Sequence, residues 1–426
     1  MKTYAIDTLG CKVNQYEIQQ IMQFLNDRGL LCVQNFAHAD FIIIHTCSVT
    51  HIASAKSRRL IRKAQKQNPN AKMIVSGCLV KSDSQELKNL DQNLLFAPDL
   101  KGLFEILKRE IGLNSFENHN LSEIGTISKF AGHTRAFLKI QDGCDGFCSY
   151  CIIPKTRPDI TSKPMEDVLA EAQRLVNSGH KEIVLTGIFL GAYSQTSVKR
   201  KNWPNGENPN LANLLEKVAQ VPDLKRIRLS SLEPADVTDG LLDVMKSFPN
   251  IMPHLHLSLQ SGSDAILKKM NRQYTVRDFL KSIENINLQL DRPAVTTDII
   301  AGFPGETTQD FAQSLSVAKL VGFSKIHIFP FSKRKGTAAE KLQGHINKEV
   351  ITQRVLMLRE LEKQLAGKFR KQFIGEAAQI LIEDEVKKSG RCERYYEITV
   401  QTDKPVEKGE IVSCKISEEG VGNRVS

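Results

Sequence analysis

The chain of 426 residues lacks any apolar run long enough to cross a membrane. Its longest apolar strings, such as Phe41–Ile44, have the length of a β-strand and fall far short of the ~20 residues of a membrane helix. Its first residues show no signal-peptide pattern, so we expect a cytoplasmic protein with no membrane partner. The nine cysteines are an odd number and cannot all pair, which favours metal ligands over a disulfide framework.

Composition and charge narrow the class of protein further. With 41% hydrophobic and 25% charged residues, the chain is typical of globular proteins. Its length is too great for a single core and predicts about two or three domains. The net charge of +10 favours a polyanionic partner such as RNA, although charge alone is a weak signal.

Three cysteines, Cys144, Cys148 and Cys151, form a C-x3-C-x2-C motif. No fourth cysteine follows nearby, and three thiolates leave one iron of a [4Fe–4S] cluster open. An open iron can bind the amino-acid end of S-adenosylmethionine, whose reductive cleavage gives a deoxyadenosyl radical. The alternative is a zinc knuckle, but no histidine lies between His133 and His180, so zinc would need a distant ligand.

Three more cysteines, Cys11, Cys47 and Cys78, share one kind of position. Each follows a predicted strand within three residues, and such turns of a parallel sheet converge at the carboxyl ends of the strands. We therefore predict a second three-thiolate cluster site; the alternative is three buried structural cysteines. The strands concerned are Thr3–Leu9, Asp40–Thr46 and Lys72–Ser76.

The order of strand-like and helical segments predicts an α/β protein. An N-terminal open parallel α/β domain (1–111) and a linker (112–129) precede a partial (β/α)6 TIM-like barrel (130–365). A small C-terminal all-β barrel (366–426) of the nucleic-acid-binding kind follows. The six barrel strands are expected at Ala136–Gln141, Glu182–Thr186, Arg226–Ser230, His254–Leu259, Ala294–Ala301 and Lys325–Phe331.

Several stretches together resemble the radical S-adenosylmethionine methylthiotransferases. The resemblance covers essentially the whole chain, from an N-terminal cluster domain to a C-terminal RNA-binding barrel of the type called TRAM. The segment Gly10–Glu17 is most similar to the bacterial tRNA enzymes that act on threonylcarbamoyladenosine. Further similar stretches are Thr186–Tyr193, Leu257–Gly262, Asp298–Glu306 and Phe329–Gly336.

The resemblance implies two [4Fe–4S] clusters, S-adenosylmethionine, a tRNA substrate and an electron donor such as a flavodoxin or ferredoxin. The barrel cysteines would generate the radical, and the N-terminal cluster would supply sulfur for methylthiolation of carbon two of adenine. Related enzymes act instead on isopentenyladenosine in tRNA or on a ribosomal protein. The ribosomal-protein enzymes are expected to have Cys-Pro-Lys-Asn where this chain has Cys11-Lys-Val-Asn14.

Polar and glycine residues at the ends of the barrel strands are the predicted contacts to S-adenosylmethionine. Gly302 lies in a turn where backbone can approach a ligand closely. The alternative for any one of these residues is that it caps a turn and makes no ligand contact. The predicted contacts are Gly187, Ser230, Ser231, Glu233, Ser258, Gln260 and Gly302.

Basic residues give the predicted RNA contacts. Arg59, Lys63 and Lys66 fall on one face of a predicted helix, which could equally be a solvated face, and Lys333 follows the sixth strand. A cation should also meet the carboxylate of the threonylcarbamoyl group, and Lys155, Arg157 and Lys333 are the candidates. Two departures from the family fall nearby. Phe189 stands where histidine is common, and Pro154–Lys163 differs from the usual Arg-Gly pattern.

Overall fold

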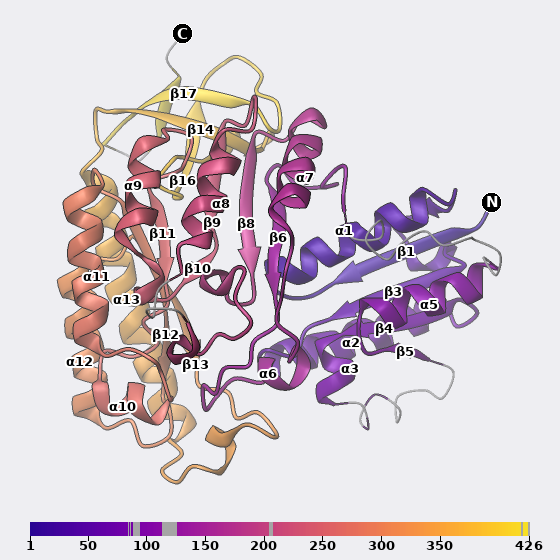
Figure 1. The fold of residues 1–426 in the computed structure, drawn as a ribbon, viewed down its shortest axis with the longest axis horizontal. Helices are drawn as coiled ribbons and strands as arrows, with labels where there is room; N and C mark the ends of the chain where they lie inside the picture. The colour runs from indigo at the N-terminus through magenta and orange to yellow at the C-terminus, as the bar shows by residue number, and fades with distance from the viewer. Residues whose placement is uncertain are drawn as a thin grey trace.

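The structure is a computed structural model that describes residues 1–83, 85, 87, 94–112, 126–203, 208–418 and 421–424. A five-stranded parallel sheet lies beside a larger α/β unit of two four-stranded sheets, and a closed β-barrel caps one end of that unit (Figure 1). The α/β fold class expected from the sequence is therefore confirmed. Within the described ranges, no helix is both long enough and apolar enough to cross a membrane.

The N-terminal unit consists of β1 (Thr3–Thr8), α1 (Lys12–Asn26), β2 (Leu31–Cys32), β3 (Phe41–Thr46), α2 (His51–Gln67), β4 (Lys72–Gly77), α3 (Cys78–Ser82), β5 (Leu95–Ala97) and α5 (Leu100–Ile111). The strand order is β2-β1-β3-β4-β5, all parallel. Helices α1 and α5 pack on one face of the sheet and α2 packs on the other, which explains why the central strands β3 and β4 are almost wholly buried and rich in apolar residues.

The central unit is built on β6 (Ala136–Asp142), α6 (Ile153–Thr156), β7 (Thr161–Ser162), α7 (Met165–Asn177), β8 (Glu182–Gly187), α8 (Asn210–Ala219), β9 (Arg226–Leu229), β10 (Ser231–Leu232), α9 (Asp239–Ser247), β11 (His254–Leu257), α10 (Asp264–Lys269), α11 (Val276–Gln289), β12 (Ala294–Ala301), α12 (Thr308–Val321), β13 (Lys325–Pro330) and α13 (Lys348–Lys371). All six predicted strands are present. Some predicted ends were wrong by one or two residues, as at β11, which stops at Leu257 and not at Leu259. The third strand is also interrupted, because β9 stops at Leu229 and β10 begins at Ser231, so Ser230 lies at a break between two sheets.

The six parallel strands form an incomplete barrel. A bridge between Ile227 and Ile251 joins the two sheets, whereas no pairing between β6 and β13 closes the barrel within the described residues. Helix α1 of the N-terminal unit packs against β6, and α3 packs against α6 (Figure 1). The carboxyl ends of the N-terminal strands and of β6 therefore meet at this junction.

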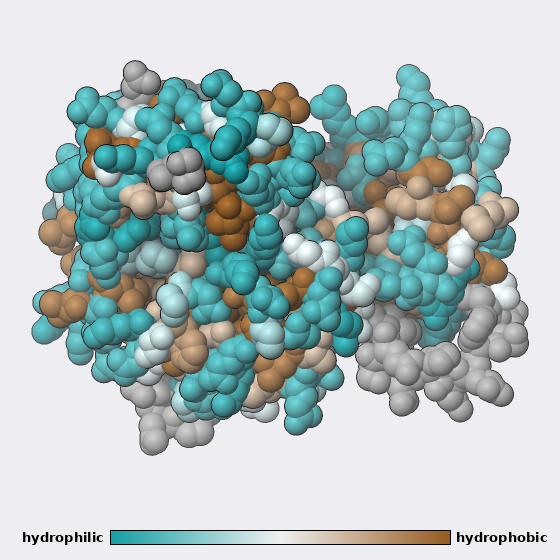
Figure 2. All heavy atoms as spheres, turned by 90° about the horizontal axis from the view of Figure 1, so that it is seen from above, coloured by the Kyte–Doolittle hydropathy of each residue, from teal (hydrophilic) through white to brown (hydrophobic). Residues whose placement is uncertain are grey.

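The C-terminal unit is a closed all-β barrel, as predicted. Its strand order is β14-β15-β16-β18-β17. Tyr395 has a φ of 71° and stacks on His254, and the strand β16 starts two residues later, at Glu397. Hydrophilic side chains cover most of this end of the molecule (Figure 2). The strands are β14 (Ala377–Asp384), β15 (Ser389–Arg391), β16 (Glu397–Gln401), β17 (Ile411–Ile416) and β18 (Gly422–Arg424).

Two buried arginines attach this barrel to the amino-terminal ends of the central strands. Arg226 donates to the backbone oxygens of Arg391 (3.0 Å) and Gln379 (2.6 Å). Arg228 donates to those of Glu393 (2.8 Å) and Cys392 (2.7 Å), and its charge is paired with buried Glu182 at 2.9 Å. The C-terminal barrel thus packs at the opposite end of the strands from the cysteine loops.

The predicted linker, 112–129, lies for the most part outside the described residues, which resume at 126. Its last part belongs to the packed structure, since Ile127 is fully buried in the central core and the Ser128 hydroxyl donates to Gln23 of α1 at 2.7 Å. The exact domain boundaries stay predictions.

Candidate functional site

The three cysteines that follow β6 line one cavity of about 130 Å³. The turn that leads into them requires glycine at position 143, where φ is 80° and an added Cβ would lie 1.9 Å from the Asp159 carbonyl oxygen. The backbone N–H of Gly146 donates to the Cys144 sulfur at 3.3 Å. The turn therefore brings Cys144, Cys148 and Cys151 together around a single space.

A ring of charged groups surrounds this cavity. Arg272 donates to the Cys148 sulfur (3.2 Å) and to Glu233 (2.6 Å), and Arg200 lies 3.3 Å from the other Glu233 oxygen. Glu233 is buried, so two guanidinium groups balance its charge. The Arg272 guanidinium would also stabilise the Cys148 thiolate of a bound cluster, because a hydrogen bond to the sulfur offsets its negative charge.

The thiols themselves are held in a poorly solvated environment. Burial raises the pKa of Cys144 to about 11 and that of Cys151 to about 12. Without metal these two groups are therefore protonated near neutral pH. Metal binding must displace their protons, which makes loading of the site dependent on pH.

The second set of cysteines converges as the parallel strands predict. Cys11 is the N-cap residue of α1, Cys47 directly follows β3, and Cys78 opens α3 directly after β4. A Cβ on Gly10 would lie 3.1 Å from the Cys47 sulfur, and Thr46 pairs with Gly77 next to Cys78. Burial, together with the nearby Cys11 and Cys78, raises the pKa of Cys47 to about 11.

Both triplets fit the cluster chemistry expected from the sequence. Each presents three thiols at one place, one fewer than a saturated [4Fe–4S] cluster uses. In the described part of the chain, no three histidine, cysteine or acidic side chains lie close enough to share a single metal ion. A cluster does not need such close ligands, because each thiolate binds a different iron.

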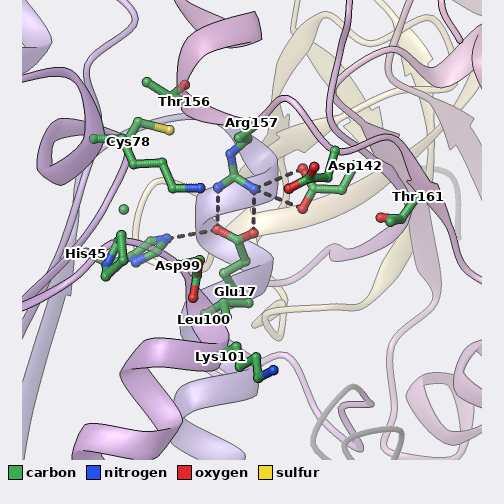
Figure 3. Close-up of a pocket in the computed structure, with 14 residues that line it drawn as sticks. Glu17, His45, Cys78, Asp99, Leu100, Lys101, Asp142, Thr156, Arg157 and Thr161 are labelled. Atoms are coloured by element: carbon green, nitrogen blue, oxygen red, sulfur yellow. Dashed lines mark hydrogen bonds and ion pairs between the residues drawn. The ribbon is translucent and has the colours of Figure 1, made fainter.

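Helix α3, which Cys78 opens, packs against α6, which begins two residues after Cys151, so the two cysteine sites lie on either side of the junction between the N-terminal sheet and the barrel. A cavity of about 420 Å³ at this junction is lined by Cys78 from one side and by Asp142 and Arg157 from the other. In Figure 3 the Arg157 guanidinium lies between the Glu17 and Asp142 carboxylates, with Cys78 and His45 nearby. The cation beside the N-terminal cysteines thus comes from the barrel loop that carries Cys151.

The seven predicted S-adenosylmethionine contacts all lie at the carboxyl ends of barrel strands, but their surroundings differ. Glu233 shares the cavity of the barrel cysteines. Ser230 is buried and its hydroxyl has no hydrogen-bond partner among the residues that the structure describes, whereas Ser231 is exposed. Gly302 has a packing role, since an added Cβ would lie 2.4 Å from Ile351 of α13.

The others, Gly187, Ser258 and Gln260, also lie where they were expected. Gly187 packs against Gln141, and the Ser258 carbonyl accepts the Tyr274 hydroxyl at 2.5 Å. Gln260 has a φ of 66°, a conformation that non-glycine residues rarely adopt and that often marks functional sites. Ligand contact by any of the seven stays a prediction.

The predicted RNA contacts are all on the surface. Arg59, Lys63 and Lys66 are exposed on α2, and Lys333 is exposed in the loop after β13. These two regions adjoin, because the His51 N–H at the start of α2 donates to the Ser332 hydroxyl at 3.0 Å. Arg334, between exposed neighbours, is buried instead and donates to Ser54 of α2.

The structure removes one residue, Arg157, from the predicted set of cations for the threonylcarbamoyl carboxylate. Arg157 is bound to Glu17 and Asp142, so its charge is already balanced. Lys155 lies against the loop after β13, where an added Cβ on Gly336 would be 3.0 Å from its Nζ. Lys155 and Lys333 are the members of the predicted set that remain available.

Sequence reasoning missed several residues of the site. Arg272 and Tyr150 line the cavity beside Cys148, and Arg272 binds the Cys148 sulfur from a loop more than a hundred residues away in the chain. Phe189, the departure from the family, also lines this cavity and carries no side-chain hydrogen-bonding group. A local motif search cannot find Arg272, although the basic residues Lys268 and Lys269 at the end of α10 and Arg272 just after it are a weak signal.

Comparison with protein families agrees with this architecture. Residues 138–318 match the Radical SAM superfamily, and residues 3–97 match a family described as "Uncharacterized protein family UPF0004". The radical S-adenosylmethionine methyltransferase TsrM of Kitasatospora setae has a similar fold, with a TM-score of 0.56 and 13% identity over 77% of this chain and 73% of that one. The fold and the cysteine motif thus define a radical S-adenosylmethionine enzyme.

The similarity to curated relatives is closer. The threonylcarbamoyladenosine tRNA methylthiotransferase MtaB of Chlamydia pneumoniae is 40% identical over 89% of this chain and 87% of the relative. MtaB of Thermotoga maritima is 36% identical over 99% and 96%. A tRNA-2-methylthio-N(6)-dimethylallyladenosine synthase of Thermodesulfovibrio yellowstonii is 32% identical over 97% and 95%. The chain belongs to the radical S-adenosylmethionine methylthiotransferase family, and the expected cofactors, S-adenosylmethionine and [4Fe–4S] clusters, are those of this family.

Proposed function

We propose that the enzyme methylthiolates carbon two of threonylcarbamoyladenosine in tRNA. The observation that supports this proposal is the presence of two three-cysteine sites on either side of one junction, where α3 after Cys78 packs against α6 after Cys151. When bound, the clusters supply reductive cleavage of S-adenosylmethionine at one site and the sulfur atom at the other. The choice of nucleoside rests on the similarity to the two MtaB relatives.

The chain's own residues would have distinct roles in this reaction. Cys144, Cys148 and Cys151 would hold the radical-forming cluster, and Arg272 would stabilise the Cys148 thiolate through its hydrogen bond. The other triplet, Cys11, Cys47 and Cys78, would hold the sulfur-supplying cluster. The domain boundaries given by the sequence belong to this proposal.

The RNA would bind across the junction between α2 and the loop after β13. Arg59, Lys63 and Lys66 would contact phosphates, which position an RNA without reading its bases. Lys333 lies next to the start of α2 and would extend the same surface toward the barrel. A cytoplasmic location and a flavodoxin or ferredoxin as electron donor complete the proposal.

The decisive experiment compares tRNA nucleosides from cells with and without the gene by mass spectrometry. We expect the methylthio form of threonylcarbamoyladenosine to disappear and its unmethylthiolated precursor to accumulate. The purified enzyme should act on tRNA carrying threonylcarbamoyladenosine and not on tRNA carrying dimethylallyladenosine. Loss of the methylthio-dimethylallyl nucleoside instead would overturn the assignment and favour the activity named for the relative from Thermodesulfovibrio yellowstonii.

A further inference from the structure

A buried network of charged groups lies between the two cysteine triplets. Glu17 of α1 accepts hydrogen bonds from Arg157 (2.7 and 2.5 Å) and from Lys139 of β6 (3.0 Å), and its side chain is only 2% exposed. Arg157 and Lys139 also bind Asp142, at 2.9 and 2.8 Å. Figure 3 shows the Arg157 guanidinium at the centre of this network.

Each member of the network is close in sequence to a cluster cysteine. Glu17 lies in the helix that Cys11 caps, and His45, which is 2.9 Å from Glu17, precedes Cys47 by two residues. Asp142 precedes Cys144 by two residues, and Arg157 follows Cys151 in the next turn of chain. A shift of this network would therefore move the two sets of cysteine loops relative to each other.

We propose that the Glu17–Arg157 pair fixes the spacing between the two cluster sites, so that both residues position the sulfur-supplying site relative to the radical-forming site. The inference rests on the proposed function, because only a reaction that uses both sites depends on their spacing. It adds to that function two residues that are neither cluster ligands nor substrate contacts.

The geometry of the pair suits this role. Both terminal nitrogens of Arg157 bind Glu17, one to each carboxylate oxygen, and such a fork fixes orientation as well as distance. Arg157 also donates to the Asn14 side chain at 3.2 Å, and Asn14 in turn donates to the Thr46 carbonyl next to Cys47 at 3.0 Å. One guanidinium from the barrel thus reaches two of the N-terminal cysteine turns.

The charges of the network are balanced within it. Two carboxylates, Glu17 and Asp142, face two cations, Lys139 and Arg157. Burial by itself would raise the pKa of Glu17, but Lys139 and Arg157 outweigh it and hold that pKa well below its usual range. The pair is therefore ionised at neutral pH and leaves no net charge to bind an anionic substrate.

A neighbouring contact offers a matched control. The hydroxyl of Tyr16, on the same helix, donates to Glu171 of α7 at 2.7 Å and accepts from Lys163 at 2.7 Å. This contact also joins α1 to the barrel, but Glu171 and Lys163 stay paired with each other without it. Tyr16→Phe removes an interdomain hydrogen bond of similar burial while the network of Glu17 stays intact.

The test compares Glu17→Gln, Arg157→Gln, the double variant and Tyr16→Phe. In the apo-proteins, amide hydrogen exchange should accelerate in α1 and in 153–157 for the network variants and not for Tyr16→Phe. In reconstituted proteins that retain the wild-type iron content, pulsed EPR of the reduced clusters should show a changed spin–spin interaction. These two measurements need no tRNA.

Turnover supplies the third measurement. Deoxyadenosine formation should continue at the wild-type rate, whereas methylthio product should fall by about tenfold or more, since a displacement of about 1 Å can cost a hundredfold. The double variant should form methylthio product no more slowly than either single variant, because each single change already breaks the same pair. The ratio of deoxyadenosine to methylthio product should therefore rise, and Tyr16→Phe should keep the wild-type ratio.

Other results would overturn the inference. An unchanged ratio, or equal losses of deoxyadenosine and product, would show that the pair serves folding or the barrel site alone. Unchanged exchange and EPR signals in the network variants would equally exclude a spacing role. If wild-type enzyme gives no product on threonylcarbamoyladenosine tRNA while exchange and EPR change as expected, the spacing role stands and the proposed substrate fails.

Discussion

The basic face of α2 allows a quantitative prediction about RNA binding. Arg59, Lys63 and Lys66 are exposed and form no ion pair with any residue that the structure describes. Each cation that neutralises a phosphate releases counterions and adds roughly 0.7 to 0.9 to the slope of log affinity against log salt. Changing all three residues to glutamine should therefore reduce the magnitude of that slope by about 2 to 3.

The same reasoning gives a change in affinity. Between about 50 and 200 mM salt, the wild type should lose roughly 20- to 40-fold more affinity than the triple variant. Fluorescence titration of labelled tRNA at several salt concentrations measures this, with modified and unmodified tRNA expected to respond alike.

A triple variant on other helices is the control. Lys319 on α12 and Arg359 and Lys363 on α13 are exposed, and their replacement by glutamine should leave the slope unchanged. Equal changes in both variants would mean that binding follows net charge alone. An unchanged slope in the α2 variant would exclude α2 as a phosphate-binding surface.

Three further predictions concern the clusters and the fold. Replacing any one of Cys144, Cys148 or Cys151 by alanine should abolish deoxyadenosine formation, because two thiolates cannot hold an open cluster firmly; a wild-type rate in any of them would contradict the assignment. Replacing Cys11, Cys47 and Cys78 together should keep deoxyadenosine formation, lose methylthio product and lower the iron content from about eight to about four per chain; an unchanged iron content would exclude the second site. Glu182→Gln leaves two buried arginines without their counter-charge, which should cost about 3 kcal/mol, so the thermal midpoint of the apo-protein should fall by about 6–12 °C. Glu376→Gln, in an exposed pair with Arg292, should leave that midpoint unchanged, and equal shifts in the two variants would refute the argument from burial.

Much of the site could be predicted because it depends on local patterns. The three N-terminal cysteines each follow an apolar strand, and parallel strands place such turns at one edge of a sheet. The motif after β6 is confined to a single loop. Neither inference needs knowledge of which helix packs against which strand.

The links between distant segments could not be predicted in this way. Glu17 and Arg157 are 140 residues apart, and no periodic pattern relates them. Arg157 was therefore interpreted as a cation for a substrate carboxylate, whereas two carboxylates of the protein already bind it. Arg226 and Arg228 are charged residues in a buried parallel strand, so the sequence indicates that they must find partners. It does not indicate that those partners are backbone carbonyls of another domain.

The attachment of the C-terminal barrel has a geometric consequence for substrate choice. This barrel packs at the amino-terminal ends of the central strands, and the cysteine loops lie at the other end. The eight residues of β12 separate these two ends by about 25 Å. An RNA held by the C-terminal barrel while its target base reaches the cysteines must therefore span the length of a strand. The fixed distance between the two ends would then select a nucleotide by its position along a folded stem and loop as well as by its chemistry.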